Sequence, residues 1–169
     1  MELLDLNYLN TIKFKGLHNR EIDYAELFFN RRILVLYLPS LIVMHEKSWH
    51  HLRNYQNRRS DFLNIGIDDI YSVSSSPWII PFIRVPAENI LALHDHNMQF
   101  LTMIKNHTQS NRNITELAKN WQFVAVINCG QIEKIIFCPT KENAPLRISM
   151  AQHNILYKLD PNSVLTKII

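Results

Sequence analysis

One stretch constrains the fold of this chain more than any other: Arg31–Leu52, which reads RRILVLYLPSLIVMHEKSWHHL. Ile33–Tyr37 is a continuous apolar run with β-branched residues, typical of a strand that is covered on both faces. Pro39 ends this strand, because proline has no N–H to donate to a sheet ladder. A polar segment that contains histidines follows and predicts a helix. A buried strand that passes through a proline turn into a helix indicates an α/β protein.

The residues after this junction complete a βαβ unit. We expect one helix from about Glu46 to Leu63, which Gly66 ends, and then a strand at Asp69–Val73. The helix is expected to bury an apolar stripe made of Trp49, Leu52, Tyr55, Phe62 and Leu63. Strand, helix and strand in this order predict a right-handed crossover with parallel pairing of the two strands.

The remainder of the chain is expected to form shorter elements around this unit, in a single domain of residues 1–169. Residues 1–10 are interpreted as an irregular lead-in and Asn106–Arg112 as a polar linker. The other predicted elements are strands at Thr11–Phe14 and Glu21–Tyr24, a helical turn at Ala25–Phe29, a strand at Asn89–Leu93, a helix at Gln99–Lys105, an antiparallel hairpin of Phe123–Asn128 with Gln131–Phe137, and a closing helix at Ile148–Leu159. This order predicts a central mixed sheet flanked by helices, a thioredoxin-like α/β fold with an N-terminal β-hairpin extension.

Charge and hydropathy argue against several classes of protein. The net charge is only +3, and the basic residues are scattered apart from Arg31-Arg32 and Arg58-Arg59, which does not indicate a nucleic-acid surface. The N-terminus carries Glu2 and Asp5 where a secretory signal would carry lysine or arginine. The apolar run Ile33–Met44 is interrupted and shorter than the roughly 20 residues that a membrane span requires. We therefore expect a cytoplasmic protein with no membrane or nucleic-acid partner.

The two cysteines are expected to be separate, reduced thiols. Cys129 and Gly130 are interpreted as the turn of the predicted hairpin, and Cys138 follows its second arm. At about 3.3 Å per residue, that arm separates the two thiols by roughly 25 Å, whereas a disulfide needs α-carbons within about 7 Å of each other. The sequence therefore predicts no bridge between them.

Six segments, taken in order, match the pattern of a known family. They are Leu9–Lys15, Tyr24–Phe28, Ile33–Pro39, Ile70–Ser74, Asn89–Asp95 and Trp121–Gly130. In their order and spacing they resemble the peroxiredoxins of the atypical, glutaredoxin- or thioredoxin-coupled branch, over roughly residues 9–159. The resemblance implies a redoxin domain, no cofactor, and dimerisation through loops near the active site.

The resemblance also implies where an active site should lie. The family pattern is proline, three residues, threonine, two residues and cysteine, with a distant arginine, and these positions fall on Pro39, Val43, Glu46 and Lys119. Peroxide reduction needs a thiolate whose pKa is lowered at a helix N-terminus beside an arginine. A carboxylate is a poor nucleophile for peroxide oxygen, valine donates no hydrogen bond, and lysine lacks the bidentate fork of arginine. The resemblance therefore implies a peroxiredoxin-like protein that lacks the peroxidatic cysteine.

A binding or regulatory role is then the expected function. Glu46 at a helix N-terminus could pair with Lys119, where the family has thiolate and arginine, or could be only a first-turn helix acid. The segment Ser76–Ile83 is unusually apolar and is expected to be a homodimer or protein-partner surface, the alternative being that it packs inside the monomer. Its large apolar residues are Trp78, Ile79, Ile80 and Phe82.

Two enzymatic alternatives remain open. One is metal chemistry at His45, Glu46 and His50, although Trp49 occupies the position where the metalloprotease pattern needs a histidine. A second small cluster, His94-Asp95-His96, lies on a predicted polar loop.

The other alternative is a thiol-dependent peroxidase or oxidoreductase that works through Cys129 or Cys138.

Overall fold

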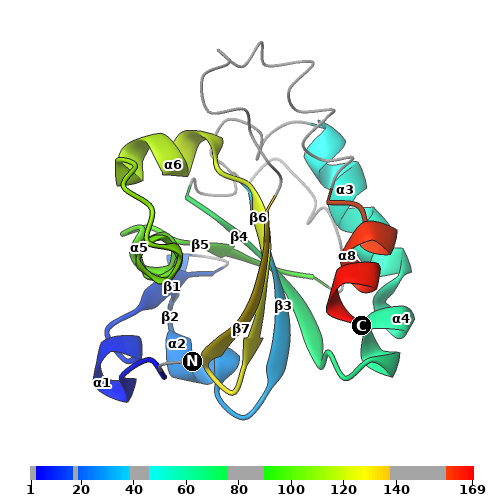
Figure 1. The fold of residues 1–169 in the computed structure, drawn as a ribbon, viewed down its shortest axis with the longest axis horizontal. Coiled ribbons are helices and arrows are strands. Elements are labelled where there is room, and N and C mark those ends of the chain that lie inside the picture. Colours follow the sequence, from blue (N-terminus) through cyan, green and yellow to red (C-terminus); the bar gives the residue numbers. More distant parts are fainter. Residues whose placement is uncertain (1–2, 17–18, 39–45, 76–89, 138–158) are drawn as a thin grey trace.

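The computed structural model describes residues 3–16, 19–38, 46–75, 90–137 and 159–169 of the chain (Figure 1). The strands in these ranges are β1 (Lys13–Lys15), β2 (Glu21–Asp23), β3 (Arg32–Leu38), β4 (Asp69–Ser74), β5 (Leu91–His94), β6 (Phe123–Asn128) and β7 (Gln131–Phe137). The helices are α1 (Leu6–Leu9), α2 (Tyr24–Phe28), α3 (Glu46–Asn57), α4 (Arg59–Asn64), α5 (Gln99–Thr108), α6 (Ile114–Asn120) and α8 (Pro161–Ile168).

The strands form one mixed sheet of seven strands in the order β2-β1-β5-β4-β3-β6-β7. β3, β4 and β5 run parallel, whereas β6 and β7 on one side and β1 and β2 on the other pair antiparallel. The parallel β3–β4 pair and the N-terminal β1–β2 hairpin are both confirmed predictions. So is the terminal hairpin, whose arms have the predicted bounds. The predicted α/β, thioredoxin-like architecture is therefore confirmed.

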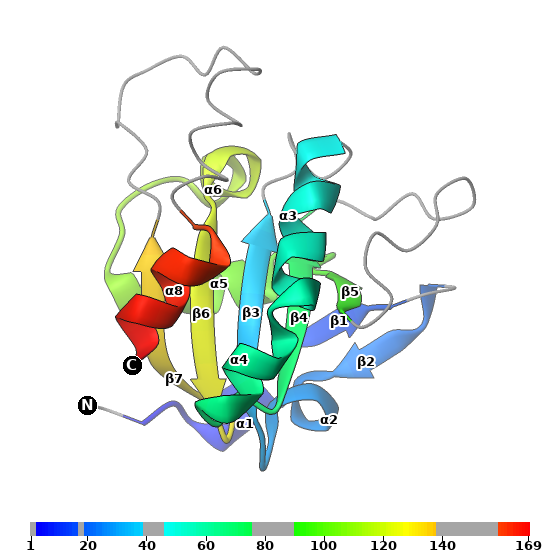
Figure 2. The same cartoon turned by 90° about the vertical axis from the view of Figure 1, so that its right-hand side faces the viewer.

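Helices cover both faces of this sheet. One view places α5 and α6 on one side of the sheet and α3, α4 and α8 on the other (Figure 1). Turned by 90°, the molecule shows α3 and α4 running along β3 and β4, with α8 across β6 and β7 (Figure 2). The sheet therefore separates two apolar clusters, each closed by its own set of helices.

β3 lies in the interior of the sheet, between β4 and β6, and contributes to both clusters. Ile33, Val35 and Tyr37 enter the cluster on the α5 side, and Leu34, Leu36 and Leu38 enter the one on the α3 side. These six side chains are all buried. Successive residues of a strand point to opposite faces of the sheet, and both faces are covered here, so every residue of the run is apolar. The predicted strand with two covered faces is confirmed.

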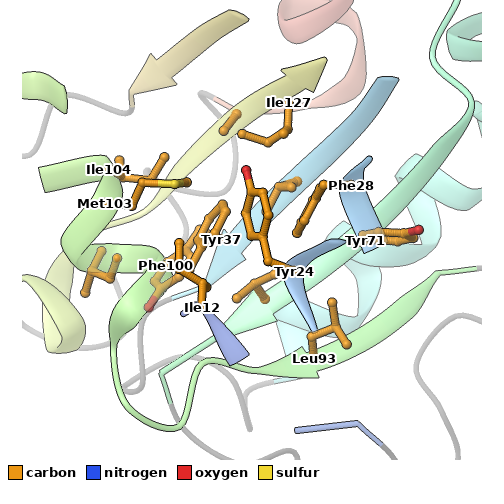
Figure 3. Packing of buried hydrophobic residues seen from close by; sticks show 14 of the residues in the cluster. Ile12, Tyr24, Phe28, Tyr37, Tyr71, Leu93, Phe100, Met103, Ile104 and Ile127 are labelled. Carbon is orange, nitrogen blue, oxygen red and sulfur yellow. The ribbon is translucent and has the colours of Figure 1, made fainter. Parts of the chain in front are cut away.

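The cluster on the α5 side is rich in aromatic rings (Figure 3). Tyr37 stacks on Phe123 with ring centroids 4.8 Å apart, and Phe100 stacks on Phe28 at 6.0 Å. Phe14 packs against both Phe28 and Phe100. Such pairs contribute about 0.5–1.5 kcal/mol each beyond the area that they bury. They join the central strand to α2, α5 and the N-terminal hairpin.

The predicted helix from Glu46 to Leu63 is wrong as a single element. The helix breaks at Arg58, whose backbone (φ −105°, ψ 10°) leaves the helical region, and α4 starts afresh at the next residue. The guanidinium of Arg58 binds Asp61 of α4 and Asn162 of α8. After the break Phe62 is buried, whereas Leu63 is 49% exposed, so Leu63 does not belong to the buried stripe.

Four helices correct the sequence analysis in other places. α1 lies inside the expected irregular lead-in, where Asp5 caps it by accepting a hydrogen bond from the Asn7 N–H at 3.0 Å. α5 extends to Thr108, into the expected linker, and α6 follows from Ile114. α8 was not predicted either. The closing helix expected at Ile148–Leu159 falls outside the described residues except for Leu159.

Candidate functional site

The carboxyl ends of the parallel strands meet at one edge of the sheet. Leu38 of β3 is level with Ser74 of β4, which is level with His94 of β5. The chain leaves β3 at this edge and begins α3 at Glu46. In open α/β sheets, ligands bind beyond the carboxyl ends of the strands. We name this region the carboxyl edge and treat it as the candidate site.

Of the four positions that the resemblance assigned to an active site, the structure describes two in part. Glu46 is the first described residue of α3, and its place at the helix N-terminus stays a prediction. Lys119 lies in the last turn of α6 and is exposed. Its neighbour Ala118 accepts a hydrogen bond through its carbonyl from the Ser75 hydroxyl at 2.8 Å, which brings the end of α6 to the carboxyl edge. The ion pair between Glu46 and Lys119 stays a prediction.

The other predicted site residues fall outside the described part of the chain. They are Pro39, Val43 and His45, together with the apolar set Trp78, Ile79, Ile80 and Phe82. Two histidines of α3 are described. His50 is exposed, whereas His51 is buried edge-on against Tyr55, with ring centroids 5.1 Å apart, and burial lowers the pKa of His51 to about 4. Among the described residues, no group of three or more histidine, cysteine, aspartate or glutamate side chains could hold a metal ion.

Cys129 lies at the opposite edge of the sheet. Its N–H donates to the carbonyl of Arg31, the residue before β3, at 2.8 Å, and its side chain is exposed and free of a disulfide. The length of β3 separates it from the carboxyl edge, roughly 20 Å at the usual rise of a strand. Cys138 is outside the described residues. It directly follows Phe137, which is level with Phe123 and hence with Tyr37, at the carboxyl edge.

The sequence analysis placed Asp95 on a polar loop and did not predict that its carboxylate is buried at the carboxyl edge. Asp95 follows β5, and its side chain is fully buried. It accepts hydrogen bonds from the N–H groups of Phe100 (3.1 Å) and Leu101 (3.0 Å) in the first turn of α5, and from the Tyr37 hydroxyl at 3.2 Å. Desolvation raises the pKa of Asp95, and the three donors oppose that shift. The carboxylate thus joins β5, α5 and β3 from inside the protein.

The two histidines beside Asp95 stay near the surface. Nε2 of His94 lies 3.2 Å from the Ser75 carbonyl, and the His94 and His96 rings are 6.0 Å apart between centroids. Burial, together with the charges of His96 and Lys15, lowers the pKa of His94. Within the predicted cluster, the Asp95 carboxylate is therefore fully buried, whereas the two imidazoles are only partly buried.

Comparison with known proteins supports the fold and leaves the chemistry open. No family model matches the sequence, and no curated protein matches it. Among solved structures, reduced Prx3 of Vibrio vulnificus in complex with hydrogen peroxide is 15% identical over 95% of this chain and 96% of its own, with a TM-score of 0.64. A second structure, described only as a peroxiredoxin, is 19% identical over 99% and 96%, with a TM-score of 0.65.

A 1-Cys peroxiredoxin, the Plasmodium falciparum antioxidant protein, is 20% identical over 90% of each chain, with a TM-score of 0.59. These neighbours span nearly the whole chain and agree in class. The chain has a peroxiredoxin-like redoxin fold, as the six segments of the sequence indicated. None of the described helices is long and apolar enough to cross a membrane.

Proposed function

We propose that this protein is a peroxiredoxin-fold scaffold that acts by binding and has no thiol peroxidase activity at the β3–α3 junction. One observation supports the proposal: the described part of the helix that follows β3 starts at Glu46, and its neighbours in the sequence are His45 and Lys47. In this fold the thiolate belongs at that helix N-terminus, where the helix dipole stabilises a negative charge. Glutamate keeps the charge there and removes the nucleophile.

An ion pair between Glu46 and Lys119 would complete such a site. The pair would replace thiolate and arginine by carboxylate and ammonium, which attract each other but cannot polarise a peroxide O–O bond in the same way. The proposal draws support from the place of Lys119 in the last turn of α6, the helix whose end meets Ser75 at the carboxyl edge. The junction would then hold one conformation rather than turn over substrate.

The apolar segment Ser76–Ile83 is proposed as the surface through which this scaffold binds a second copy or another protein. A double variant, Trp78→Asp with Ile80→Asp, is expected to convert a dimer into monomers in sedimentation velocity. Leu63→Asp, at an exposed apolar residue of α4, serves as the matched control and should leave the association state unchanged. A parent protein that is monomeric at every accessible concentration would overturn this part of the proposal.

Thiol chemistry through Cys138 is the second candidate function. The observation that favours it over Cys129 is the position of Phe137, the last residue of β7, at the carboxyl edge. Cys129 lies at the far edge, beside Arg31. If this chain reduces peroxide at all, Cys138→Ser should abolish turnover and Cys129→Ser should not.

The deciding experiment is peroxide consumption with dithiothreitol or glutathione–glutaredoxin as reductant. The parent is expected to show no turnover above buffer. Glu46→Cys tests whether the helix N-terminus can still activate a thiol, and His50→Cys, one turn further along α3, is the matched control. We expect the Glu46→Cys thiol to ionise below the usual pKa of about 8.5 and the control thiol near it, as read from thiolate absorbance.

The possible results of this assay distinguish the binding proposal from the second candidate function. Turnover by Glu46→Cys alone would support an intact scaffold with a substituted site. Absence of peroxidase activity in both Glu46→Cys and His50→Cys, together with equal thiol pKa values in the two variants, would mean that the junction does not stabilise an anion. Turnover by the parent that disappears in Cys138→Ser would refute the binding proposal in favour of the second candidate.

A further inference from the structure

The chain turns between the end of β5 and the start of α5. Asp95 points inward, since its carboxylate is buried and bonded to the first turn of α5. His94 is the last residue of β5, and His96 lies in the turn that follows, which the Met98 N–H closes by donating to the Asp95 carbonyl at 3.0 Å. Their rings are 6.0 Å apart between centroids and tilted by 61°. Two imidazole rings therefore lie beside each other at the carboxyl edge.

The hydrogen bond of His94 determines which of its nitrogens is available. Its Nε2 lies 3.2 Å from the Ser75 carbonyl, and because a carbonyl only accepts, Nε2 carries the proton. Nδ1 of His94 then keeps a free lone pair. A histidine that binds a metal commonly donates its other N–H to a backbone carbonyl in this way. His94 is thus oriented and held in the tautomer of a metal ligand.

His96 supplies the second observation. Among the described residues, its Nδ1 is one of the few buried side-chain nitrogens or oxygens that have no hydrogen-bond partner. Buried polar atoms are nearly always paired, and an exception needs a cause. An ion between the two rings would give a nitrogen of His96 a partner.

We propose that His94 and His96 together bind one divalent transition-metal ion such as Zn²⁺, with Nδ1 of His94 as one ligand and a ring nitrogen of His96 as the other. Imidazole nitrogen suits zinc, copper and nickel. Two imidazoles on one tetrahedral zinc, at bonds of about 2.0 Å, have centroids roughly 5 Å apart, so a small ring rotation from the observed 6.0 Å suffices. The other coordination positions are open to water or to a ligand of the ion.

Two neighbouring charges define what the site can bind. Asp95 is engaged with Phe100, Leu101 and Tyr37 and is therefore not a ligand. Lys15 of β1 is level with His94, and its ammonium opposes a cation. With two protein ligands and one opposing charge, the site is suited to moderate, reversible binding. The proposal is independent of whether the β3–α3 junction has catalytic activity.

The test is titration of the full chain with ZnCl₂ by isothermal calorimetry, with far-UV circular dichroism to verify that each variant is folded. The parent should bind one ion per chain, and His94→Gln or His96→Gln should each weaken binding by at least about tenfold. His107→Gln, at an exposed histidine of α5, is the matched control and should leave the affinity unchanged. Lys15→Gln should strengthen binding a few-fold, as expected for removal of one partly screened charge.

Long-range ¹H–¹⁵N spectra of the imidazoles provide a second readout. The metal-free protein should show the proton of His94 on Nε2, and zinc should shift Nδ1 of His94 and a nitrogen of His96. The proposal is overturned if the parent shows no saturable binding, or if binding of one ion survives both His94→Gln and His96→Gln. Loss of that binding in His50→Gln instead would assign the ion to α3.

Discussion

Replacing Asp95 by alanine is the sharpest test of how the carboxyl edge is built. The carboxylate accepts three hydrogen bonds, from the N–H groups of Phe100 and Leu101 and from the hydroxyl of Tyr37, and it is fully buried. Its removal leaves three buried donors without an acceptor, each at a cost of about 1–3 kcal/mol. Water that enters the space left by the side chain offsets part of this, so we expect a net loss of about 3–5 kcal/mol.

Urea unfolding at pH 7 and 25 °C, followed by circular dichroism, measures this loss directly. Tyr37→Phe removes only the longest of the three bonds and should cost about 0.5–1.5 kcal/mol. Asn97→Ala, on the exposed part of the same turn, is the control and should stay within about 0.5 kcal/mol of the parent. A cost below about 1 kcal/mol for Asp95→Ala would refute the reasoning, because the first turn of α5 would then have to be held by other groups.

The same carboxylate makes stability depend on pH in a defined direction. Burial raises the pKa of Asp95 above its unfolded value of 3.8, so the folded protein holds this proton more tightly than the unfolded chain. The contribution is therefore fully present below pH 3.8 and is lost as the pH rises through the folded pKa. Asp95→Asn should remove this component from a plot of unfolding free energy against pH, and an unchanged plot would contradict the assignment.

Three further predictions test other parts of the fold. Gly130→Ala should lower the free energy of unfolding in urea by about 2–4 kcal/mol, because Gly130 has φ +84° and a Cβ there would lie 2.8 Å from the ring of Phe29. In the control Gly16→Ala, the new Cβ meets only the end of the flexible Ile22 side chain, so the loss should be less than about 1 kcal/mol. Burial lowers the pKa of His51 from 6.5 to about 4, so the contribution of His51 to stability is present above pH 6.5 and is lost as the pH falls towards 4, up to about 3 kcal/mol. His51→Asn should therefore flatten the plot of unfolding free energy against pH in this range. An equally steep plot for the variant would contradict the assignment. Because Leu63 is 49% exposed on α4, Leu63→Lys should change the free energy of unfolding by less than about 0.5 kcal/mol. A large loss of stability would instead indicate that Leu63 belongs to the buried apolar stripe.

The sequence predicted those elements whose pattern depends on neighbours in the chain. The continuous apolar run predicts β3, and the Cys129-Gly130 turn between two apolar segments predicts the β6–β7 hairpin. Both elements lie where the sequence predicts them. α6 had a readable signal that was not used: Asn113 caps it through the Thr115 N–H at 2.8 Å, and Glu116 follows three residues after the cap.

Other features depend on contacts that no local pattern contains. The break at Arg58 coincides with contacts to Asn162, more than a hundred residues away. The inward turn of Asp95 depends on Tyr37 and on the start of α5, so the sequence could show three polar residues in a row but not which of them is buried. At the β3–α3 junction the sequence gives the residue at position 46, a glutamate. Whether Glu46 pairs with Lys119 depends on the distance between their side chains, which no sequence pattern contains.

The position of β3 between β4 and β6 has a consequence for how the chain is made. Its parallel partner β4 begins about 30 residues after β3 ends, but its antiparallel partner is far away, since Tyr37 is level with Phe123, a separation of 86 residues (123 minus 37). At synthesis rates of about 5–20 residues per second, one edge of this apolar strand stays unpaired for roughly 4–17 s before β6 is synthesised. During that interval the middle of the finished sheet is an open edge, where other unpaired strands can attach. A strand that is interior in the folded protein is therefore an exposed edge during translation.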